Sequence, residues 1–343
     1  MSQKFSAIKK ILFFRTDRIG DFLLNLPALH ALKATYPHAK ITVVLRPLVG
    51  ELLLRHPDID ETISFDTTLK PPLSSWWRLF KTLRQQKYDL AIVSNPHKNL
   101  HLLCFLLGIP HRIGYDRKWP FLLTRAIADQ KSQSLKHEVE YNLDLVCAAG
   151  AALPPHSNPE DHYKIYVTRQ EEAELEKLLL IHRIPRQTSL IVVNPYTTNP
   201  KKQWPIEKMR DLIKKLSASG AVLLIGGIDD QSRIKHEILN KMDVTNLFDL
   251  SGQLTLRQLS ALLKKTDVLI SNDSGPVHIA AAFGTKMVIL FGTQNAGSNP
   301  ARWGPWHPDH HSHLCKIVIK PDIRRISVDE VWETTRHQLT SSF

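Results

Sequence analysis

Short apolar runs alternate with longer amphipathic segments along almost the whole chain, and this alternation restricts the possible folds more than any other feature. The runs predict strands, and the segments between them, where apolar residues recur every three or four positions, predict helices. Strands that alternate with helices of this length pair in parallel, because each helix returns the chain to the start of the next strand. We therefore expect an α/β fold with Rossmann-like, doubly wound sheets.

The alternation occurs in two series, separated by a polar, proline-rich stretch at 153–163. The first series has predicted strands at 8–14, 41–45, 62–65, 88–94 and 111–114, and helices at 21–32, 49–55, 76–86 and 99–107. The second has strands at 189–194, 221–225, 246–249, 267–271 and 287–291, and helices at 206–217, 230–241, 256–264, 276–283 and 328–339. A chain of 343 residues suits two domains. We place them at 1–160 and 161–343, with the last helix free to pack back on the first domain.

The charge balance favours anionic partners. Lys and Arg number 45 against 33 acidic residues, which gives a formal charge of +12. Nucleic acid, anionic lipid and phosphorylated glycans all fit this charge. The basic residues are spread along the chain, and no zinc-finger or RNP motif occurs, so we do not expect nucleic acid.

Cysteine usage and hydropathy indicate a cytoplasmic protein. Cys104, Cys147 and Cys315 are far apart, which predicts neither a disulfide framework nor a zinc site. No segment approaches the roughly 20 apolar residues that a membrane span requires, so contact with a bilayer would be peripheral. The basic, aromatic stretch 76–84 is typical of a helix on an anionic membrane, and equally of a core helix with a charged outer face.

Ligands of open α/β sheets bind at the carboxyl ends of the strands, so the loops there are candidate sites. The first such loop is RTDRIGD, residues 15–21. Gly20 permits a tight turn, and Asp21 either caps the following helix or acts as a general base on an attacking hydroxyl.

The second loop, DSGPVH at 273–278, opens a helix. The free N–H groups of such a helix start form a natural site for a diphosphate. Asp273 would then contact sugar hydroxyls, because two anions repel each other. Ser274 and Gly275 line the turn, and His278 either reaches the phosphate or packs under the loop.

The third loop, NPYTTNPKKQWP at 194–205, is rich in hydroxyls and lysine. Thr197, Thr198 and Lys202 could neutralise a departing diphosphate, or the loop could be an ordinary solvated one. Gly226, after a later strand, could let a nucleotide approach the backbone, although glycine is common at such turns.

These segments together resemble the bacterial heptosyltransferases of glycosyltransferase family nine, which extend the inner core of lipopolysaccharide from ADP-heptose. The likeness covers nearly the whole chain. It rests on RTDRIGDFLLNLPALHALKATYP, KYDLAI, RIGYD, HEVEYNLDLV, KKQWP, SNDSGPVHIAAAFGTKMVILFG and NPARWGPW.

The resemblance implies a GT-B fold, in which two Rossmann-like domains face each other across a cleft. The acceptor would bind the N-terminal domain and the ADP-sugar the C-terminal domain. The catalytic Asp of the family falls on Asp21 and its phosphate-neutralising Lys on Lys202. Its donor loop falls on Asp273, Ser274, Gly275 and His278.

The resemblance therefore implies an inverting, metal-independent heptosyltransferase that needs no cofactor. Its partners would be ADP-heptose, a lipopolysaccharide core acceptor and the anionic inner face of the inner membrane. A relative that uses another nucleotide sugar or acceptor, and a non-catalytic polyanion-binding module, are the alternatives.

Overall fold

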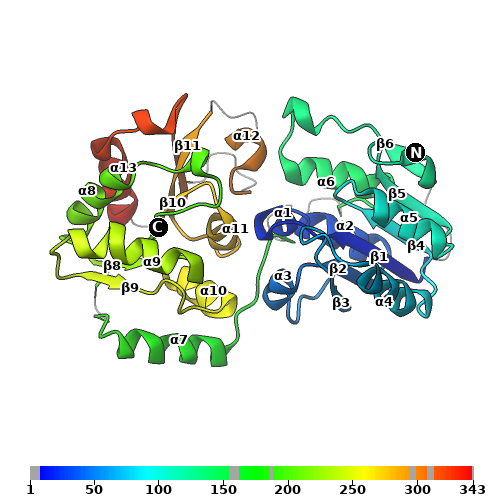
Figure 1. Cartoon of the computed structure of the whole chain (residues 1–343), viewed down its shortest axis with the longest axis horizontal. Coiled ribbons are helices and arrows are strands. Elements are labelled where there is room, and N and C mark those ends of the chain that lie inside the picture. Colours follow the sequence, from blue (N-terminus) through cyan, green and yellow to red (C-terminus); the bar gives the residue numbers. More distant parts are fainter. Residues whose placement is uncertain (1–7, 154–161, 186–187, 294–298, 307–312, 342–343) are drawn as a thin grey trace. The chain divides into compact units, whose positions relative to one another are not determined.

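The computed structural model describes residues 8–153, 162–185, 188–293, 299–306 and 313–341. The chain forms two compact units, Met1–Tyr166 and Val167–Phe343 (Figure 1). Our expected boundary at residue 160 lies in the proline-rich stretch, of which residues 154–161 fall outside the described part. The observed division comes a few residues later, between Tyr166 and Val167.

The first unit is built on a six-stranded sheet in the order β3-β2-β1-β4-β5-β6, and every ladder in it is parallel. Its strands are β1 Lys10–Arg15, β2 Lys40–Leu45, β3 Glu61–Ser64, β4 Leu90–Val93, β5 His111–Tyr115 and β6 Arg125–Ile127. The central strands are apolar on both faces and fully buried, as a parallel sheet covered by helices on both sides requires.

Helices cover this sheet. They are α1 Ile19–Leu23, α2 Leu26–Thr35, α3 Pro47–Leu52, α4 Leu73–Arg84, α5 Lys98–Leu106 and α6 Glu138–Cys147. Leu79 of α4 and Leu103 of α5 pack into one apolar cluster with Leu12 and Phe14 of β1. Helices α2 and α6 pack against each other. The predicted α/β architecture is confirmed for this unit.

The single helix that we expected from Asp21 to Leu32 is two helices, because Pro27 interrupts it. Proline has no N–H, and its ring would clash with the carbonyl group four residues earlier in a continuous helix. The chain therefore ends α1 and restarts at α2, with Pro27 in the first turn. Asp21 lies in the first turn of the short helix α1. Its backbone oxygen accepts a hydrogen bond from the Asn25 side chain (2.8 Å).

The second unit has a six-stranded parallel sheet in the order β12-β11-β10-β7-β8-β9. Its strands are β7 Leu190–Asn194, β8 Ala221–Leu224, β9 Leu247–Asp249, β10 Val268–Asn272, β11 Met287–Gly292 and β12 Cys315–Lys320. Counted from the first strand of each unit, the two strand orders are the same. The direction of strand addition reverses between β1 and β4 in one sheet, and between β7 and β10 in the other.

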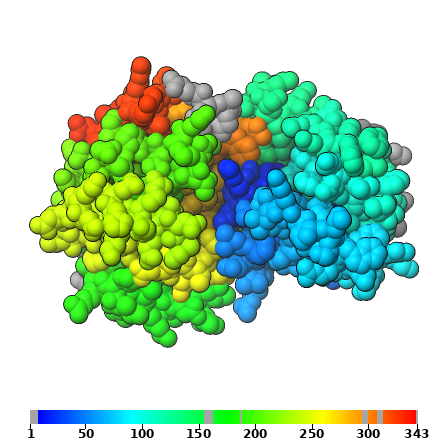
Figure 2. All heavy atoms as spheres, viewed as in Figure 1, coloured from blue at the N-terminus to red at the C-terminus, as the bar shows by residue number. Residues whose placement is uncertain are grey.

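Seven described helices accompany this sheet: α7 Arg169–Ile181, α8 Ile206–Leu216, α9 Ile228–Glu237, α10 Leu256–Lys265, α11 Gly275–Ala281, α12 Pro300–Trp303 and α13 Val328–Thr340. Figure 2 shows that α7, α9 and α10 (green to yellow) form much of the visible surface of this unit. Within this unit, α13 contacts α8, β10, β11 and β12. Its Val331 joins the apolar cluster of the second sheet, so burial of its apolar face fixes its position.

Candidate active site

A buried serine lies at the point where strand order reverses in each sheet. Ser94 follows β4, beside the end of β1, and its Oγ accepts a hydrogen bond from Arg15 (3.2 Å). Ser271 is paired with Asn194 across β10 and β7, and its Oγ accepts a hydrogen bond from the Asn194 side chain (3.2 Å). Both serines are fully buried. These are the positions where ligands of doubly wound sheets bind.

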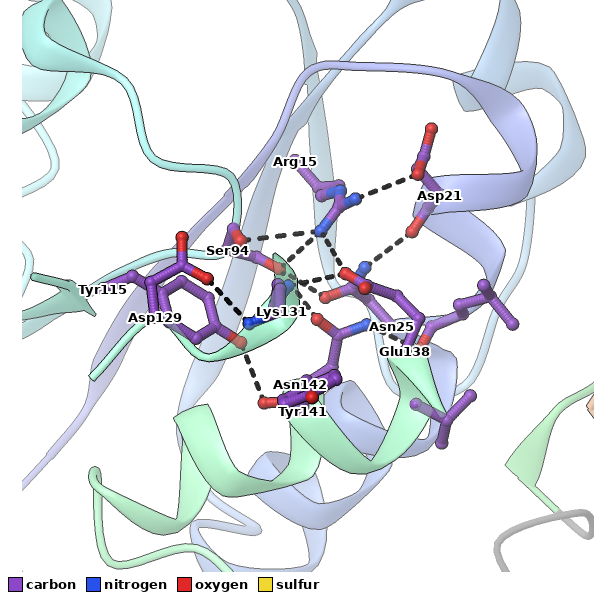
Figure 3. A network of polar contacts seen from close by, with 12 residues as sticks. Arg15, Asp21, Asn25, Ser94, Tyr115, Asp129, Lys131, Glu138, Tyr141 and Asn142 are labelled. Atoms are coloured by element: carbon purple, nitrogen blue, oxygen red, sulfur yellow. Dashed lines mark hydrogen bonds and ion pairs between the residues drawn. The ribbon is translucent and has the colours of Figure 1, made fainter. Parts of the chain in front are cut away.

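In the first unit, a buried guanidinium group organises the site (Figure 3). Arg15 Nε donates to Asp17 Oδ1 (2.7 Å), and its Nη2 donates to Asp21 Oδ1 (3.3 Å). Its Nη1 faces Ser94 and, at 3.5 Å, Glu138 Oε1. Burial opposes the charge of Arg15, but the three carboxylates outweigh it and raise the pKa of the guanidinium above its ordinary value. Arg15 is therefore a permanent cation at the end of β1.

Asp21 has the geometry of a general base. One carboxylate oxygen is held by Arg15, while the second oxygen has no hydrogen-bond partner among the described residues and points away from the network (Figure 3). The side chain is 18% exposed, so a ligand can reach it. A base needs one free oxygen within reach of the proton that it removes.

Asp17 is the second carboxylate of this loop, and its side chain is a partner of the same guanidinium group. Burial raises the pKa of Asp17 to about 6, against the attraction of Arg15 and together with repulsion from Asp21. Its Oδ1 takes the shortest of the Arg15 contacts. The structure thus places Asp17 as a partner of Arg15 within the loop.

In the second unit, the loop between β10 and α11 is tied to neighbouring loops. Asn272 accepts a hydrogen bond from the backbone N–H of Trp204 (2.9 Å) and donates to the Pro195 carbonyl (3.1 Å). Ser274 is the N-cap residue of α11, yet its side chain makes no capping bond. Its hydroxyl instead accepts from Asn194 (2.9 Å), so the first-turn N–H groups of α11 have no side-chain cap.

Lys202 points to this same loop. Its Nζ donates to Asp273 Oδ2 at 2.6 Å, and both side chains are mostly buried. The neighbouring Lys201 is exposed. The Asn199 side chain accepts a hydrogen bond from the N–H of Lys201 and caps the short 3-10 turn Pro200–Lys202. The structure therefore brings together Lys202, Asp273 and the start of α11.

The other predicted donor residues occupy more varied positions. His278 is buried at 5% exposure, Thr197 is half-buried and Thr198 is exposed. Gly226 packs against its own following helix, because a Cβ there would lie 2.9 Å from the Cβ of Asp230. This close packing explains why the position holds a glycine without reference to any ligand.

Several polar residues of these sites were not predicted from the sequence: Ser94, Lys131, Glu138, Asn194, Ser271 and Asn272. The strand-end positions of Asn194 and Ser271 were a usable signal, since buried strands rarely end in polar side chains without a role. Among the described residues, no three His, Cys, Asp or Glu side chains are arranged to hold a metal ion. None of the described helices has both the length and the apolar character of a membrane span.

The architecture defines the class of protein. The structure of Escherichia coli ADP-heptose lipopolysaccharide heptosyltransferase II matches with a TM-score of 0.79 at 23% identity, covering 96% of this chain and 98% of that one. This likeness establishes a glycosyltransferase fold of the GT-B type, as predicted.

The particular family follows from the sequence. Residues 76–331 match the model of glycosyltransferase family 9 (heptosyltransferase), so the chain belongs to this family. Lipopolysaccharide heptosyltransferase 3 of Escherichia coli is 26% identical over 302 residues, 84% of this chain and 83% of that protein. Lipopolysaccharide heptosyltransferase 2 of Salmonella typhimurium is 27% identical over 301 residues, 85% of each. The resemblance inferred from the motifs is confirmed, and the protein is a glycosyltransferase.

Proposed function

We propose that this enzyme transfers a heptose from ADP-heptose to a hydroxyl of the lipopolysaccharide inner core, with inversion at the anomeric carbon. Family membership and relatives named as lipopolysaccharide heptosyltransferases support the substrate class. The observation that carries the chemistry is Asp21, a carboxylate in the first turn of α1 with one oxygen held and the other open. Such a group is suited to remove a hydroxyl proton.

In the proposed reaction, the second oxygen of Asp21 takes the proton of the acceptor hydroxyl. The acceptor oxygen forms a bond to the anomeric carbon as the bond from that carbon to the diphosphate oxygen breaks. The bonding pair leaves with ADP, whose new charge is stabilised by Lys202 and by the N–H groups around Ser274 and Gly275. These fixed groups perform the neutralisation without a metal ion or cofactor.

Asp273 and the threonines complete the donor site in this proposal. Asp273 now holds Lys202 in an ion pair. When the diphosphate takes the ammonium group, Asp273 is released to accept hydrogen bonds from the sugar hydroxyls. Thr197 and Thr198 donate to phosphate oxygens, His278 supports the loop from beneath, and Gly226 faces the nucleotide.

The proposal is tested with purified protein, ADP-heptose and a panel of truncated core acceptors, with products identified by mass. We expect one heptose to be added to an inner-core acceptor. Transfer from UDP-sugars or GDP-sugars in place of ADP-heptose would show that the donor is misassigned. A protein that gains no thermal stability from any nucleotide sugar would instead be a non-catalytic binder.

Two substitutions test the residue roles. Asp21→Asn should lower turnover about 100- to 10,000-fold, because the base is lost while the shape is kept. Lys202→Ala should lower kcat/KM for the donor about 100-fold or more, whereas Lys201→Ala, its exposed neighbour, should stay near the wild-type value. Near wild-type rates for both Asp21→Asn and Lys202→Ala would contradict the proposed chemistry.

We further propose that the enzyme works in the cytoplasm, attached peripherally to the anionic inner face of the inner membrane. Helix α4 supports this, because it uses Leu79 and Leu83 for the core and leaves Trp77 56% exposed. Lys81 lies over the Trp77 ring at 5.4 Å, so aromatic and cationic groups share the outer face. Such a face suits anionic headgroups.

Co-sedimentation with vesicles tests this attachment. We expect binding to phosphatidylcholine vesicles that contain phosphatidylglycerol, weaker binding to pure phosphatidylcholine, and a loss for Trp77→Ala. Ile181→Ala, at a 75% exposed apolar residue of α7, is the matched control. Equal losses in both variants, or none in either, would argue against a role for α4.

A further inference from the structure

Glu138 is a buried carboxylate that lies between two cations. It is the first residue of α6 and is 1% exposed. Its Oε1 is 2.5 Å from Lys131 Nζ and 3.5 Å from Arg15 Nη1. Lys131 is itself buried, with its ammonium 4.4 Å from the centre of the Tyr115 ring. Lys131, Glu138, Arg15 and Asp21 thus form a continuous line of charges (Figure 3).

The start of α6 does not need Glu138 as a cap. His137 Nδ1 accepts from the N–H of Val139, and the Glu140 side chain accepts from the N–H of His137 (2.8 Å). This capping box already satisfies the helix end. Buried ion pairs also add little stability compared with apolar residues of similar size. The charge of Glu138 therefore calls for a reason other than folding.

That reason is found at the other end of Arg15. A guanidinium group is a rigid planar fork, so fixing two of its nitrogens fixes the direction of the third. Asp17 holds Nε, while Glu138 and Ser94 hold the Nη1 side. The Nη2 group is thereby aimed at one oxygen of Asp21 and leaves the other oxygen open.

We propose that Glu138 is a positioning residue for the base Asp21, acting through Arg15, and that Lys131 anchors Glu138 from behind. This inference rests on the proposed role of Asp21 as the base. Arg15 contacts both Glu138 and Asp21, so the proposed effect of Glu138 on the reaction passes through the guanidinium group. Misplacement of a reacting group by about 1 Å can lower a rate about 100-fold.

The first test is Glu138→Gln, which keeps the shape and removes the charge. We expect kcat to fall about 10- to 100-fold while KM for ADP-heptose is unchanged. We also expect the acid limb of the pH profile to move to lower pH. Loss of this negative charge makes ionisation of Asp17, which Arg15 also holds, easier, and the cations Arg15 and Lys131 remain.

Glu140→Gln is the matched control, because Glu140 lies on the same helix and does not contact Arg15. Gln keeps a side-chain oxygen that accepts from the N–H of His137, so the capping box is retained, and Tm, kcat and the pH profile should all stay near the wild-type values. A Glu138→Gln enzyme with wild-type kcat and pH profile would overturn the proposal.

A double variant guards against a folding defect, because Glu138→Gln leaves Lys131 as a buried cation that has lost this carboxylate. Lys131→Met with Glu138→Gln removes both charges and should restore Tm while kcat stays low. Recovery of kcat together with Tm would show that Glu138 serves folding only, and would overturn the proposal.

A readout without turnover separates this inference from the proposed function. In the wild type, the Asp21 side chain is oriented toward Arg15. A crystal structure of the double variant should show this side chain turned away from Arg15. An unchanged Asp21 would overturn the positioning role. A wild-type protein that transfers no heptose would overturn the function alone, and the structure of the variant would still decide whether Glu138 orients Asp21.

Discussion

Two carboxylates four positions apart share the Arg15 guanidinium group, and each of them bonds to a different nitrogen of that group. Asp17 holds Nε at 2.7 Å, whereas Asp21 holds Nη2 at 3.3 Å and keeps one oxygen open. Because burial raises the pKa of Asp17 to about 6, its proton is exchanged close to neutral pH. The charge next to the proposed base therefore changes with mild acidification.

Asp17→Asn should alter how stability depends on pH. The pKa of Asp17 is raised from 3.8 to about 6, so the folded state holds this proton more tightly than the unfolded state. Its stabilising contribution is present at low pH and is lost as pH rises through about 6. The wild type loses this contribution as pH rises, and Asp17→Asn does not. The unfolding free energy of the variant minus that of the wild type should therefore be about 1–2 kcal/mol larger at about pH 7.5 than at about pH 4.5.

Urea unfolding at both pH values measures this difference. Asn lacks the ionisation but keeps the size, so the comparison isolates the proton. A difference between variant and wild type that is the same at both pH values would mean that Asp17 does not titrate in this range.

The sequence predicted the residues that lie in loops directly after strands, because topology places those loops together. Asp21, Lys202 and Asp273 were chosen as candidates in this way, and the structure joins the last two in an ion pair. Glu138 and Lys131 were not predicted as site residues. They belong to segments far from Asp21 in the chain, and only the folded sheet brings them to Arg15.

At the scale of elements, the central strands of both sheets and the edge strands β3 and β9 were predicted, whereas the edge strands β6 and β12 were missed. Strands β6 and β12 lie at sheet edges and are largely exposed, so they lack the continuous apolar runs of buried strands. Helices α6 and α7 were also missed. In α7 the sequence Thr168-x-x-Glu171 forms a capping box, which was a readable start signal.

Gly226→Ala tests how tightly the β8–α9 turn is packed. A Cβ at this position would lie 2.9 Å from the Cβ of Asp230, so the helix must move. We expect a loss of about 1–3 kcal/mol in unfolding free energy, together with a several-fold rise in KM for ADP-heptose as the turn shifts. Thermal unfolding and donor kinetics measure the two effects.

Gly227→Ala is the control for this substitution. Its nearest contact would be Asp230 Oδ2 at 3.7 Å, and its φ of −72° suits any residue. Its stability should stay within about 0.5 kcal/mol of the wild type. Equal stability of the two variants would show that the turn has more room than its geometry indicates.

At the scale of the whole molecule, the same strand order occurs twice, and each copy places a buried serine at its reversal point. The polar partner differs. In the first unit the serine bonds to the cation Arg15, whereas in the second it bonds to the neutral amide of Asn194. One unit thus builds a carboxylate site around a cation, and the other builds a neutral support for the loop that we propose to bind the diphosphate.

Ser94→Ala and Ser271→Ala should therefore have similar effects on folding and different effects on the reaction. Each removes a buried hydroxyl with several hydrogen bonds, at a cost of about 1–3 kcal/mol. We expect Ser94→Ala to lower kcat through Arg15, and Ser271→Ala to raise KM for the donor through Ser274. Thermal unfolding and two-substrate kinetics measure both, and interchanged kinetic effects would contradict the assignment of the units.

Because both sheets have the same strand order, a position at the centre of one sheet has an equivalent position in the other. A variant at one position can therefore serve as the reference for a variant at the equivalent position, measured under the same conditions. An effect that two equivalent positions share belongs to the architecture, and we expect an effect that differs between them to reflect the two proposed substrates.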